Sequence, residues 1–178
     1  MSEYQYYEFC RLHQPLSAEA RKEMAALSSR AKVGTHNAIY VYNYGDFRGK
    51  PLALLLKHFD VFFYISNFGT IQLIFKYLRK EVDLSAIENH CVEQVIDCDE
   101  EGQWVWLDIS ITNEETSFDW LEGEEYLADF LPIYDEIKNG NYQFLEAVKL
   151  FKEGESDALS SLNLSAAQKI FLDVCVGN

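Results

Sequence analysis

Carboxylates dominate the part of this chain that could do chemistry. From Glu81 to Ile137 the sequence contains eighteen Asp and Glu residues and no Lys or Arg. Closely spaced carboxylates can hold a divalent cation or act as an acid–base pair in hydrolysis. They can also form an acidic surface that attracts a basic partner, or a solvated flank with no specific role. These three explanations compete for the segment.

Two groups of carboxylates decide between them. The first, at 97–101, surrounds an expected hairpin turn, where a calcium site is conceivable, but the spacing of an EF-hand loop is absent. The second, at 114–125, fills a loop and the start of a helix, where the helix dipole alone favours acidic side chains in the first turn. A solvated flank is the simplest explanation of the remaining carboxylates, and no metal ligand set or cofactor site is expected.

Aromatic residues among these carboxylates favour a surface for a partner. Tryptophan and tyrosine are enriched in interfaces, and acidic rims steer basic partners. If the C-terminal helices cover only the other face of the sheet, an aromatic patch with an acidic rim remains. We therefore expect a partner-binding surface formed by Asp99, Glu100, Glu101, Trp104, Trp106, Glu114, Glu115, Phe118, Asp119, Trp120 and Glu122.

Cysteine and histidine give weaker signals. Cys10 and His13 have ligand-compatible spacing, and His90, Cys91 and Cys98 could complete a zinc site, but one CxxH pair is a weak indication. The sequence contains neither a GxSxG nucleophile motif nor a P-loop. The four irregularly spaced cysteines indicate free, mostly buried thiols in a reducing cytoplasm.

Charge is divided unequally along the chain. Residues 1–80 carry eleven Lys and Arg against six Asp and Glu, and residues 81–178 carry four against twenty-three. This balance disfavours phosphate backbones and anionic membranes and favours a basic protein surface. The two halves could instead neutralise each other after folding. The basic residues through which nucleic acid could bind are Arg48, Lys50, Lys57, Lys76, Arg79 and Lys80.

Hydrophobic periodicity predicts the elements that position these side chains. The residues Val105, Leu107, Ile109 and Ile111 alternate with Trp104, Trp106 and Asp108, which places the tryptophans on the side of the strand away from the core. Tyr40, Tyr42 and Tyr44 likewise share one face, and Asn67-Phe68-Gly69 predicts a hairpin turn. Strands are expected at 4–12, 38–44, 61–66, 70–78, 92–97 and 103–111, and helices at 17–29, 51–59, 84–89, 124–137, 142–152 and from Ser165 onward.

This order predicts one α+β domain spanning 1–178. Its part at 1–112 mixes strands and helices in a mostly antiparallel sheet of five to six strands, and its part at 113–178 contains the acidic loop and about three helices. No apolar run reaches the roughly 18–20 residues of a membrane span, and the first ten residues lack the order of a signal peptide. We expect a cytoplasmic protein.

Several short strings resemble a family of uncharacterised bacterial proteins. They are YQYYEF at 4–9 followed by PLSAE, YNYGDFRG at 42–49, YISNFGT at 64–70 and LSAAQKIFLDV at 164–174. The resemblance extends to both ends of the chain and implies a bacterial, cytoplasmic setting without an assigned activity. The chain departs from the family pattern at His13-Gln14, where a charged pair is expected, and at Phe68, where tryptophan is expected.

Two hypotheses follow. The first is a non-enzymatic interaction or regulatory module whose acidic, aromatic surface meets a basic partner, with self-association through the aromatic face as a variant. The second is an enzyme that uses a carboxylate or Cys/His site in a cleft between the sheet and the C-terminal helices.

Overall fold

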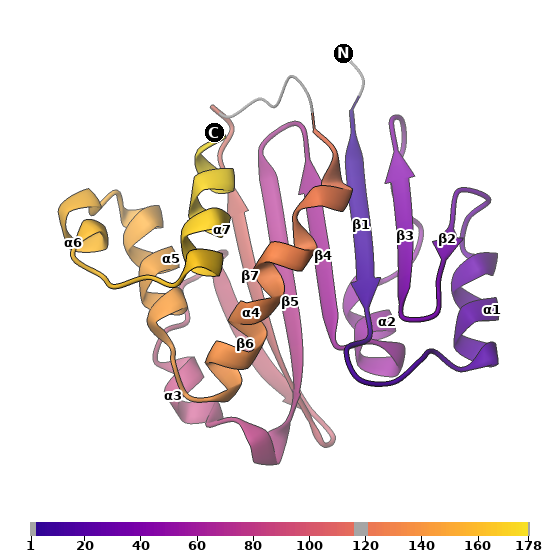
Figure 1. The fold of residues 1–178 in the computed structure, drawn as a ribbon, viewed down its shortest axis with the longest axis horizontal. Coiled ribbons are helices and arrows are strands. Elements are labelled where there is room, and N and C mark those ends of the chain that lie inside the picture. Colours follow the sequence, from indigo (N-terminus) through magenta and orange to yellow (C-terminus); the bar gives the residue numbers. More distant parts are fainter. Residues whose placement is uncertain (1–2, 116–120, 178) are drawn as a thin grey trace.

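The computed structural model describes residues 3–115 and 121–177. Its centre is a seven-stranded antiparallel sheet with the strand order β2-β3-β1-β4-β5-β7-β6 (Figure 1). Strands that follow one another in the chain pair as hairpins at β4–β5 and β6–β7, whereas β1 lies between β3 and β4. The strands are β1 (Gln5–Cys10), β2 (Lys32–Val33), β3 (Asn37–Tyr42), β4 (Val61–Ser66), β5 (Thr70–Leu78), β6 (Ile96–Glu101) and β7 (Trp104–Thr112).

Helices lie on both faces of this sheet. Three of them have side-chain caps that satisfy free backbone donors at their first turn: Ser17 accepts from Ala20, Asp83 accepts from Ala86, and Ser165 and Gln168 form a capping box. The helices are α1 (Ala18–Ala26), α2 (Pro51–His58), α3 (Leu84–Glu88), α4 (Leu127–Lys138), α5 (Gln143–Glu153), α6 (Ser156–Ser160) and α7 (Ala166–Val176), with 3₁₀ turns η1 (Arg79–Glu81) and η2 (Gly123–Glu125).

The larger core lies between one sheet face and the C-terminal helices. Figure 1 shows α4 and α7 crossing in front of β4, β5 and β7. Phe130 of α4 contacts Phe63 of β4 and Phe171 of α7, with ring centroids 5.6 and 5.2 Å apart. At the start of this layer Gly123 lies against the ring of Tyr6, and a side chain at position 123 would overlap that ring. The apolar side chains of Phe75, Leu107, Ile109, Phe144 and Leu145 complete the packing.

A smaller core lies on the opposite face, beneath α1 and α2. Phe9 of β1 is fully buried, and its ring contacts Phe62 of β4 and Phe59 after α2 at 4.8 and 5.2 Å. Tyr40 of β3 is also buried, and its hydroxyl donates to the Met24 carbonyl at 2.6 Å. This core reaches from β3 to Ile74 of β5. Beyond it, β7 and β6 present side chains on this face that remain partly or well exposed.

The expected fold class is confirmed, with differences in detail. The sheet has seven strands because Lys32–Val33 pairs with β3, and a two-residue strand is too short to leave a pattern in the sequence. The C-terminal group contains one more short helix, α6. Within the described residues no helix combines the length and the apolar character that a membrane crossing requires.

The strand expected at 92–97 was placed wrongly. Residues 92–96 form a tight loop in which Gln94 has a φ of 63°, and β6 instead runs from Ile96 to Glu101. The turn follows at Gly102-Gln103, where Gly102 adopts a φ of 62° that glycine accommodates without strain. The acidic residues expected in the turn therefore belong to a strand.

Candidate functional site

The exposed half of the second sheet face carries both tryptophans of β7. We call this surface the open face. Antiparallel pairing places Trp106 opposite Lys76 of β5 on one side and Asp99 of β6 on the other, and Trp104 similarly opposite Glu101. The residues of the open face are Gln72, Lys76, Asp97, Asp99, Glu101, Trp104, Trp106, Asp108 and Ser110.

Partial exposure distinguishes the two indoles from the core aromatics. Trp104 and Trp106 are half-buried, whereas Leu107 and Ile109, on the other side of the same strand, are fully buried. Asp99 and Glu101 beside them are exposed. The open face thus offers aromatic surface flanked by accessible carboxylates, and the alternation of the sequence predicted the side on which the tryptophans lie.

Lys76 shows what kind of group suits this surface. Its ammonium lies 4.3 Å from the centre of the Trp104 ring, an arrangement in which the ring quadrupole attracts a cation. The same ammonium lies 3.4 Å from the carbonyls of Leu55 and Leu56 at the C-terminal end of α2, and 4.0 Å from Asp60. Burial lowers the pKa of Lys76, and the Asp60 carboxylate partly opposes that shift. The sequence placed Lys76 among the basic residues through which nucleic acid could bind and gave no sign of this burial.

The carboxylates of β6 are free to meet a partner. In the part of the chain that the structure describes, no ion pair involves Asp97, Asp99 or Glu101. Asp108 accepts two hydrogen bonds from the Gln72 amide at 2.9 and 3.0 Å. Its pKa is raised, chiefly by burial and further by the charge of Asp97 directly opposite, and the bond from Gln72 opposes this. Negative charge is therefore crowded along the β6 side of the open face.

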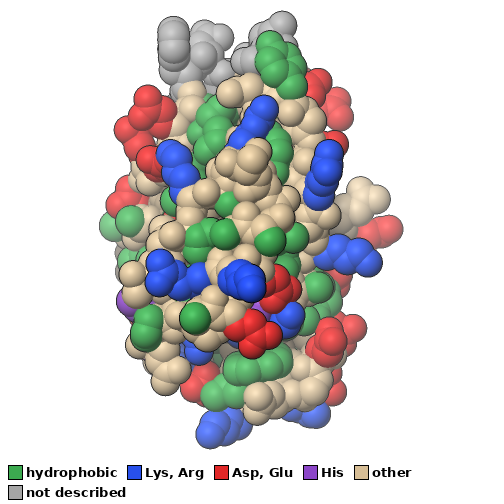
Figure 2. Space-filling view, turned by 90° about the vertical axis from the view of Figure 1, so that its right-hand side faces the viewer, with side chains coloured by type: hydrophobic (Ala, Val, Ile, Leu, Met, Phe, Trp, Pro, Cys, Tyr) green, Lys and Arg blue, Asp and Glu red, His purple; other side chains and the backbone are tan. Residues whose placement is uncertain are grey.

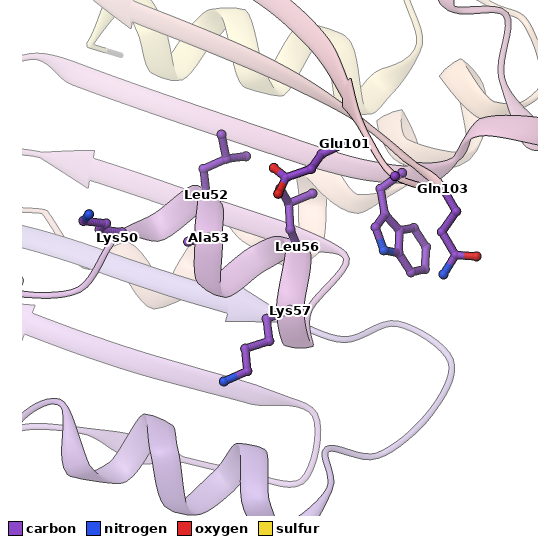
Figure 3. A pocket seen from close by; sticks show the side chains of 9 residues that line it. Lys50, Leu52, Ala53, Leu56, Lys57, Glu101 and Gln103 are labelled. Carbon is purple, nitrogen blue, oxygen red and sulfur yellow. The ribbon is translucent and has the colours of Figure 1, made fainter.

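A groove of about 710 Å³ runs beside the open face, between α2 and the β6–β7 turn. Its α2 wall carries the partly exposed Leu52 and Leu56, and its other wall carries Glu101 and Gln103 (Figure 3). Trp104 lines the groove and also belongs to the open face, so the two surfaces are continuous. Apolar surface and a carboxylate are available together at this junction. The sequence could not show it, because α2 and the turn are distant in the chain.

The other expected partner-binding residues do not join this surface. Glu100 lies on the opposite side of β6 and pairs with Arg79 at 3.0 Å. Glu114 and Glu115 lie beyond the far end of β7, and Glu122 precedes η2 on the face covered by the C-terminal helices. Phe118, Asp119 and Trp120 lie outside the described residues.

Few ion pairs connect the basic part of the chain, residues 1–80, to the acidic part, residues 81–178, among the described residues. Among the ion pairs of the described residues, Lys32–Glu124 at 3.3 Å and Arg79–Glu100 at 3.0 Å connect residues 1–80 to residues 81–178. Both pairs are well exposed to solvent, where ion pairs contribute little. Figure 2 shows lysine and arginine side chains over the side of the molecule formed by α1 and β2. Internal pairing therefore leaves most of the acidic half unneutralised.

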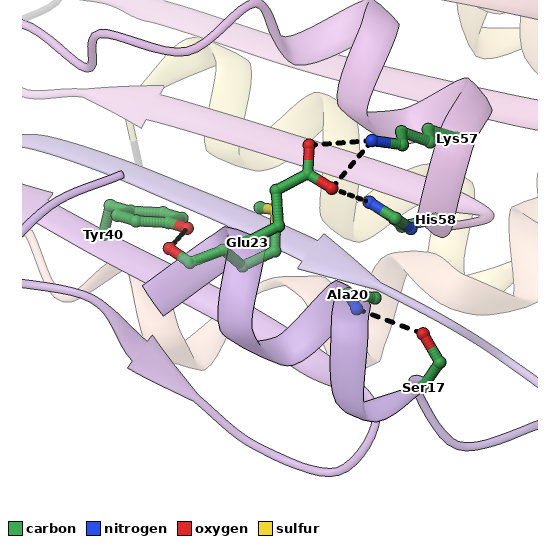
Figure 4. Close-up of polar contacts among 7 residues, drawn as sticks. Ser17, Ala20, Glu23, Tyr40, Lys57 and His58 are labelled. Atoms are coloured by element: carbon green, nitrogen blue, oxygen red, sulfur yellow. Dashed lines mark hydrogen bonds and ion pairs between the residues drawn. The ribbon is translucent and has the colours of Figure 1, made fainter. Parts of the chain in front are cut away.

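A basic cluster between α1 and α2 is satisfied by its own carboxylate. Glu23 accepts from Lys57 at 2.8 and 3.0 Å and from His58 Nε2 at 2.7 Å, as Figure 4 shows. The bond from Lys57 and then the bond from His58 lower the pKa of Glu23. These contacts join the two helices of the smaller core and give Lys57, one of the eleven basic residues of the first half, a structural role.

Metal chemistry receives no support from the described residues. Residues 3–115 and 121–177 contain no group of three or more His, Cys, Asp or Glu side chains that could hold a metal ion. Apolar side chains fill the space between the sheet and the C-terminal helices, where the enzyme hypothesis placed its cleft. The four thiols are free, but the expectation that most of them are buried is wrong: Cys175 is buried, Cys10 and Cys98 are half-buried, and Cys91 is exposed.

Comparisons of the chain with protein-family models, with curated proteins and with solved structures find no match.

Proposed function

We propose that this protein is an interaction module that binds an extended, arginine- or lysine-rich segment of a partner protein on the open face. The observation that carries the proposal is the arrangement of Trp104 and Trp106, each opposite a carboxylate of β6 that has no ion pair within the described residues. A guanidinium group can stack on an indole while it donates to a neighbouring carboxylate, so both components suit arginine.

The spacing of the two tryptophan–carboxylate pairs, Trp104 with Glu101 and Trp106 with Asp99, suits an extended partner. Trp104 and Trp106 lie two residues apart on a strand, which is about 7 Å. Alternate residues of an extended partner repeat at the same distance, so each of two successive basic side chains can contact one tryptophan–carboxylate pair. The groove beside α2, lined by Leu52 and Leu56 together with Lys50 and Lys57, adds apolar surface at one end of the open face. A nucleic acid fits less well, because the β6 carboxylates repel phosphates.

Calorimetric titration with an extended peptide tests the proposal. The probe is an eight-residue peptide of alternating arginine and valine with neutral ends, and a peptide with glutamate in place of arginine is its control. We expect binding of the arginine peptide that weakens as salt rises, because the contacts are electrostatic. A single-stranded oligonucleotide should not bind.

Two charge-matched double variants locate the site. Asp99→Asn with Glu101→Gln removes two carboxylates from the open face, and Glu114→Gln with Glu115→Gln removes two from the region beyond β7. The first should weaken binding by roughly fivefold to thirtyfold, at about 0.5–1 kcal/mol for each lost contact. The second should leave affinity nearly unchanged. Equal weakening by both would show that net charge alone attracts the peptide, and light scattering would reveal self-association as an alternative use of the face.

A further inference from the structure

Two cysteine thiols meet at the outer edge of the sheet. Cys98 lies on β6, with its side chain on the face opposite to that of Asp97 and Asp99, and Cys91 follows the end of α3. Their Sγ atoms are 3.2 Å apart, and Cys91 also lies 3.9 Å from the Ile87 carbonyl. A disulfide bond is about 2.05 Å long, so the sulfurs need to approach by only about 1 Å.

Backbone hydrogen bonds hold the two cysteines in position without help from the thiols. Val92 and Ile96 exchange two hydrogen bonds of 2.9 Å, and Val95 donates to Val92 at 3.0 Å. Ser110 of β7 donates to the Val95 carbonyl at 2.8 Å, which ties the loop to the sheet. The chain between Cys91 and Cys98 is therefore closed before any covalent bond forms, and little conformational entropy remains to be lost on bond formation.

The surroundings of the four cysteines separate this pair from the others. Cys91 is exposed and can meet a dissolved oxidant, whereas Cys175 is buried and Cys10 is half-buried. Burial raises the pKa of Cys10 to about 11 and also raises that of Cys175, so neither forms the reactive thiolate readily. Burial, followed by its hydrogen bond with Cys91, raises the pKa of Cys98. Cys98 therefore keeps its proton while Cys91 faces solvent.

We propose that Cys91 and Cys98 are an oxidative modification site that hydrogen peroxide converts into an intramolecular disulfide. The Cys91 thiolate attacks one peroxide oxygen, the O–O bond breaks, and hydroxide leaves, which gives a sulfenic acid at Cys91. The Cys98 sulfur then attacks the Cys91 sulfur, the S–O bond breaks, and the Cys98 proton leaves with the hydroxyl group as water. Two thiols and one peroxide thus yield one disulfide and two waters. This inference does not depend on the proposed function.

Intact mass and peptide mapping test the site on the full chain. After treatment with one equivalent of hydrogen peroxide, we expect the loss of two hydrogen atoms and a fall from four free thiols to two. Cleavage after glutamate cuts at Glu93, between the two cysteines, so their peptides should remain joined until dithiothreitol is added. The rate should increase with pH, since the thiolate is the attacking form.

Variants make the outcome decisive. The double variant Cys10→Ser with Cys175→Ser should form the disulfide as the wild type does, and Cys91→Ser should not form it. Cys98→Ser should accumulate a sulfenic acid at Cys91 that dimedone traps, because the resolving thiol is absent. Four unchanged thiols in the wild type, a cross-link between chains, or overoxidation of Cys91 with Cys98 still free would each overturn the proposal.

Discussion

One face of the sheet is used in two ways. Over β3, β1 and β4, the aromatic residues Phe9, Tyr40 and Phe62 lie beneath α1 and α2 and are fully or almost fully buried. Over β5, β7 and β6, Trp104 and Trp106 are only half-buried. The aromatic residues of the covered half lie against other buried rings, among them Phe47 and Phe59, whereas each indole of the open half lies opposite a carboxylate of β6. The difference indicates that aromatic strand residues serve as core where a helix covers them and as contact surface where charge replaces the helix.

Alanine substitution in the two halves should give the largest contrast in stability. Phe9→Ala removes a buried ring that contacts Phe62 and Phe59, and should lower the free energy of unfolding by about 3–5 kcal/mol. Trp106→Ala removes a half-exposed ring and should cost about 1 kcal/mol. Urea denaturation of both variants measures the difference. Similar losses in both would mean that Trp106 is a core residue and that the two halves do not differ.

On peptide binding the order should be reversed: Trp106→Ala should have the larger effect and Phe9→Ala the smaller. Trp106→Ala should weaken the arginine peptide by roughly tenfold to thirtyfold, as expected for an aromatic residue at the centre of an interface. Trp106→Phe, which keeps a ring, should lose less. Tyr44→Ala is the matched control, because Tyr44 is 73% exposed but lies after β3, outside the open face. Titration calorimetry decides, and an equal loss with Tyr44→Ala would contradict the placement of the site.

The sequence predicted the faces of single strands well. The alternation of Val105, Leu107, Ile109 and Ile111 with the tryptophans is a local property of β7, and side chains alternate across a strand whatever its neighbours are. The ends of β4 and β5 were also predicted correctly, since Gly69 marks the turn between two apolar runs. Local periodicity and turn chemistry are sufficient for such features.

The arrangement of the elements could not be predicted in the same way. Whether α2 covers β4 or reaches β7 depends on contacts between segments that are distant in the chain, and this decides which aromatic residues stay exposed. Tyr40 and Tyr42 are buried while Tyr44 is exposed, although the three share one pattern, because β3 ends at Tyr42. The burial of Lys76 against the end of α2 and the contact between Cys91 and Cys98 depend on such distant or loop-mediated arrangements as well.

A pH profile of stability should reveal the crowded charge on the open half. The raised pKa of Asp108 means that the folded state binds the proton more tightly than the unfolded state, so this residue favours folding at low pH and that contribution is lost as pH rises through its titration. Asp108→Asn should therefore be more stable than the wild type at pH 7, by a few tenths to about 1 kcal/mol, and the difference should disappear in acid. Thermal denaturation from pH 3 to pH 8 measures it.

Asp97→Asn provides the control for that profile. It removes the opposing charge while Asp108 stays ionised, so the titration of Asp108 should move toward lower pH in carboxyl-resolved NMR. If the wild type were still less stable than Asp108→Asn in acid, the ionised Asp108 carboxylate would not be the cause of the difference at pH 7, because a protonated Asp108 should be equivalent to asparagine.

The smallest expected effect lies on the covered half and has the opposite dependence on pH. Lys57 and then His58 lower the pKa of Glu23, so its contribution to stability is present above its unfolded pKa and is lost as pH falls through the lower folded pKa. Glu23→Gln should therefore lower the melting temperature by about 2 °C at pH 7 and by less in acid. Glu93→Gln is the control and should change the melting temperature little, because Glu93 is exposed and has no ion pair among the described residues. Thermal denaturation across the same pH range compares both halves directly. The negative charge of Glu23 stabilises the covered half because it joins two helices, and the negative charge of Asp108 destabilises the open half because burial and the nearby Asp97 charge oppose its ionisation. If Glu23→Gln instead raised the melting temperature at pH 7, the contrast between the two halves would be lost.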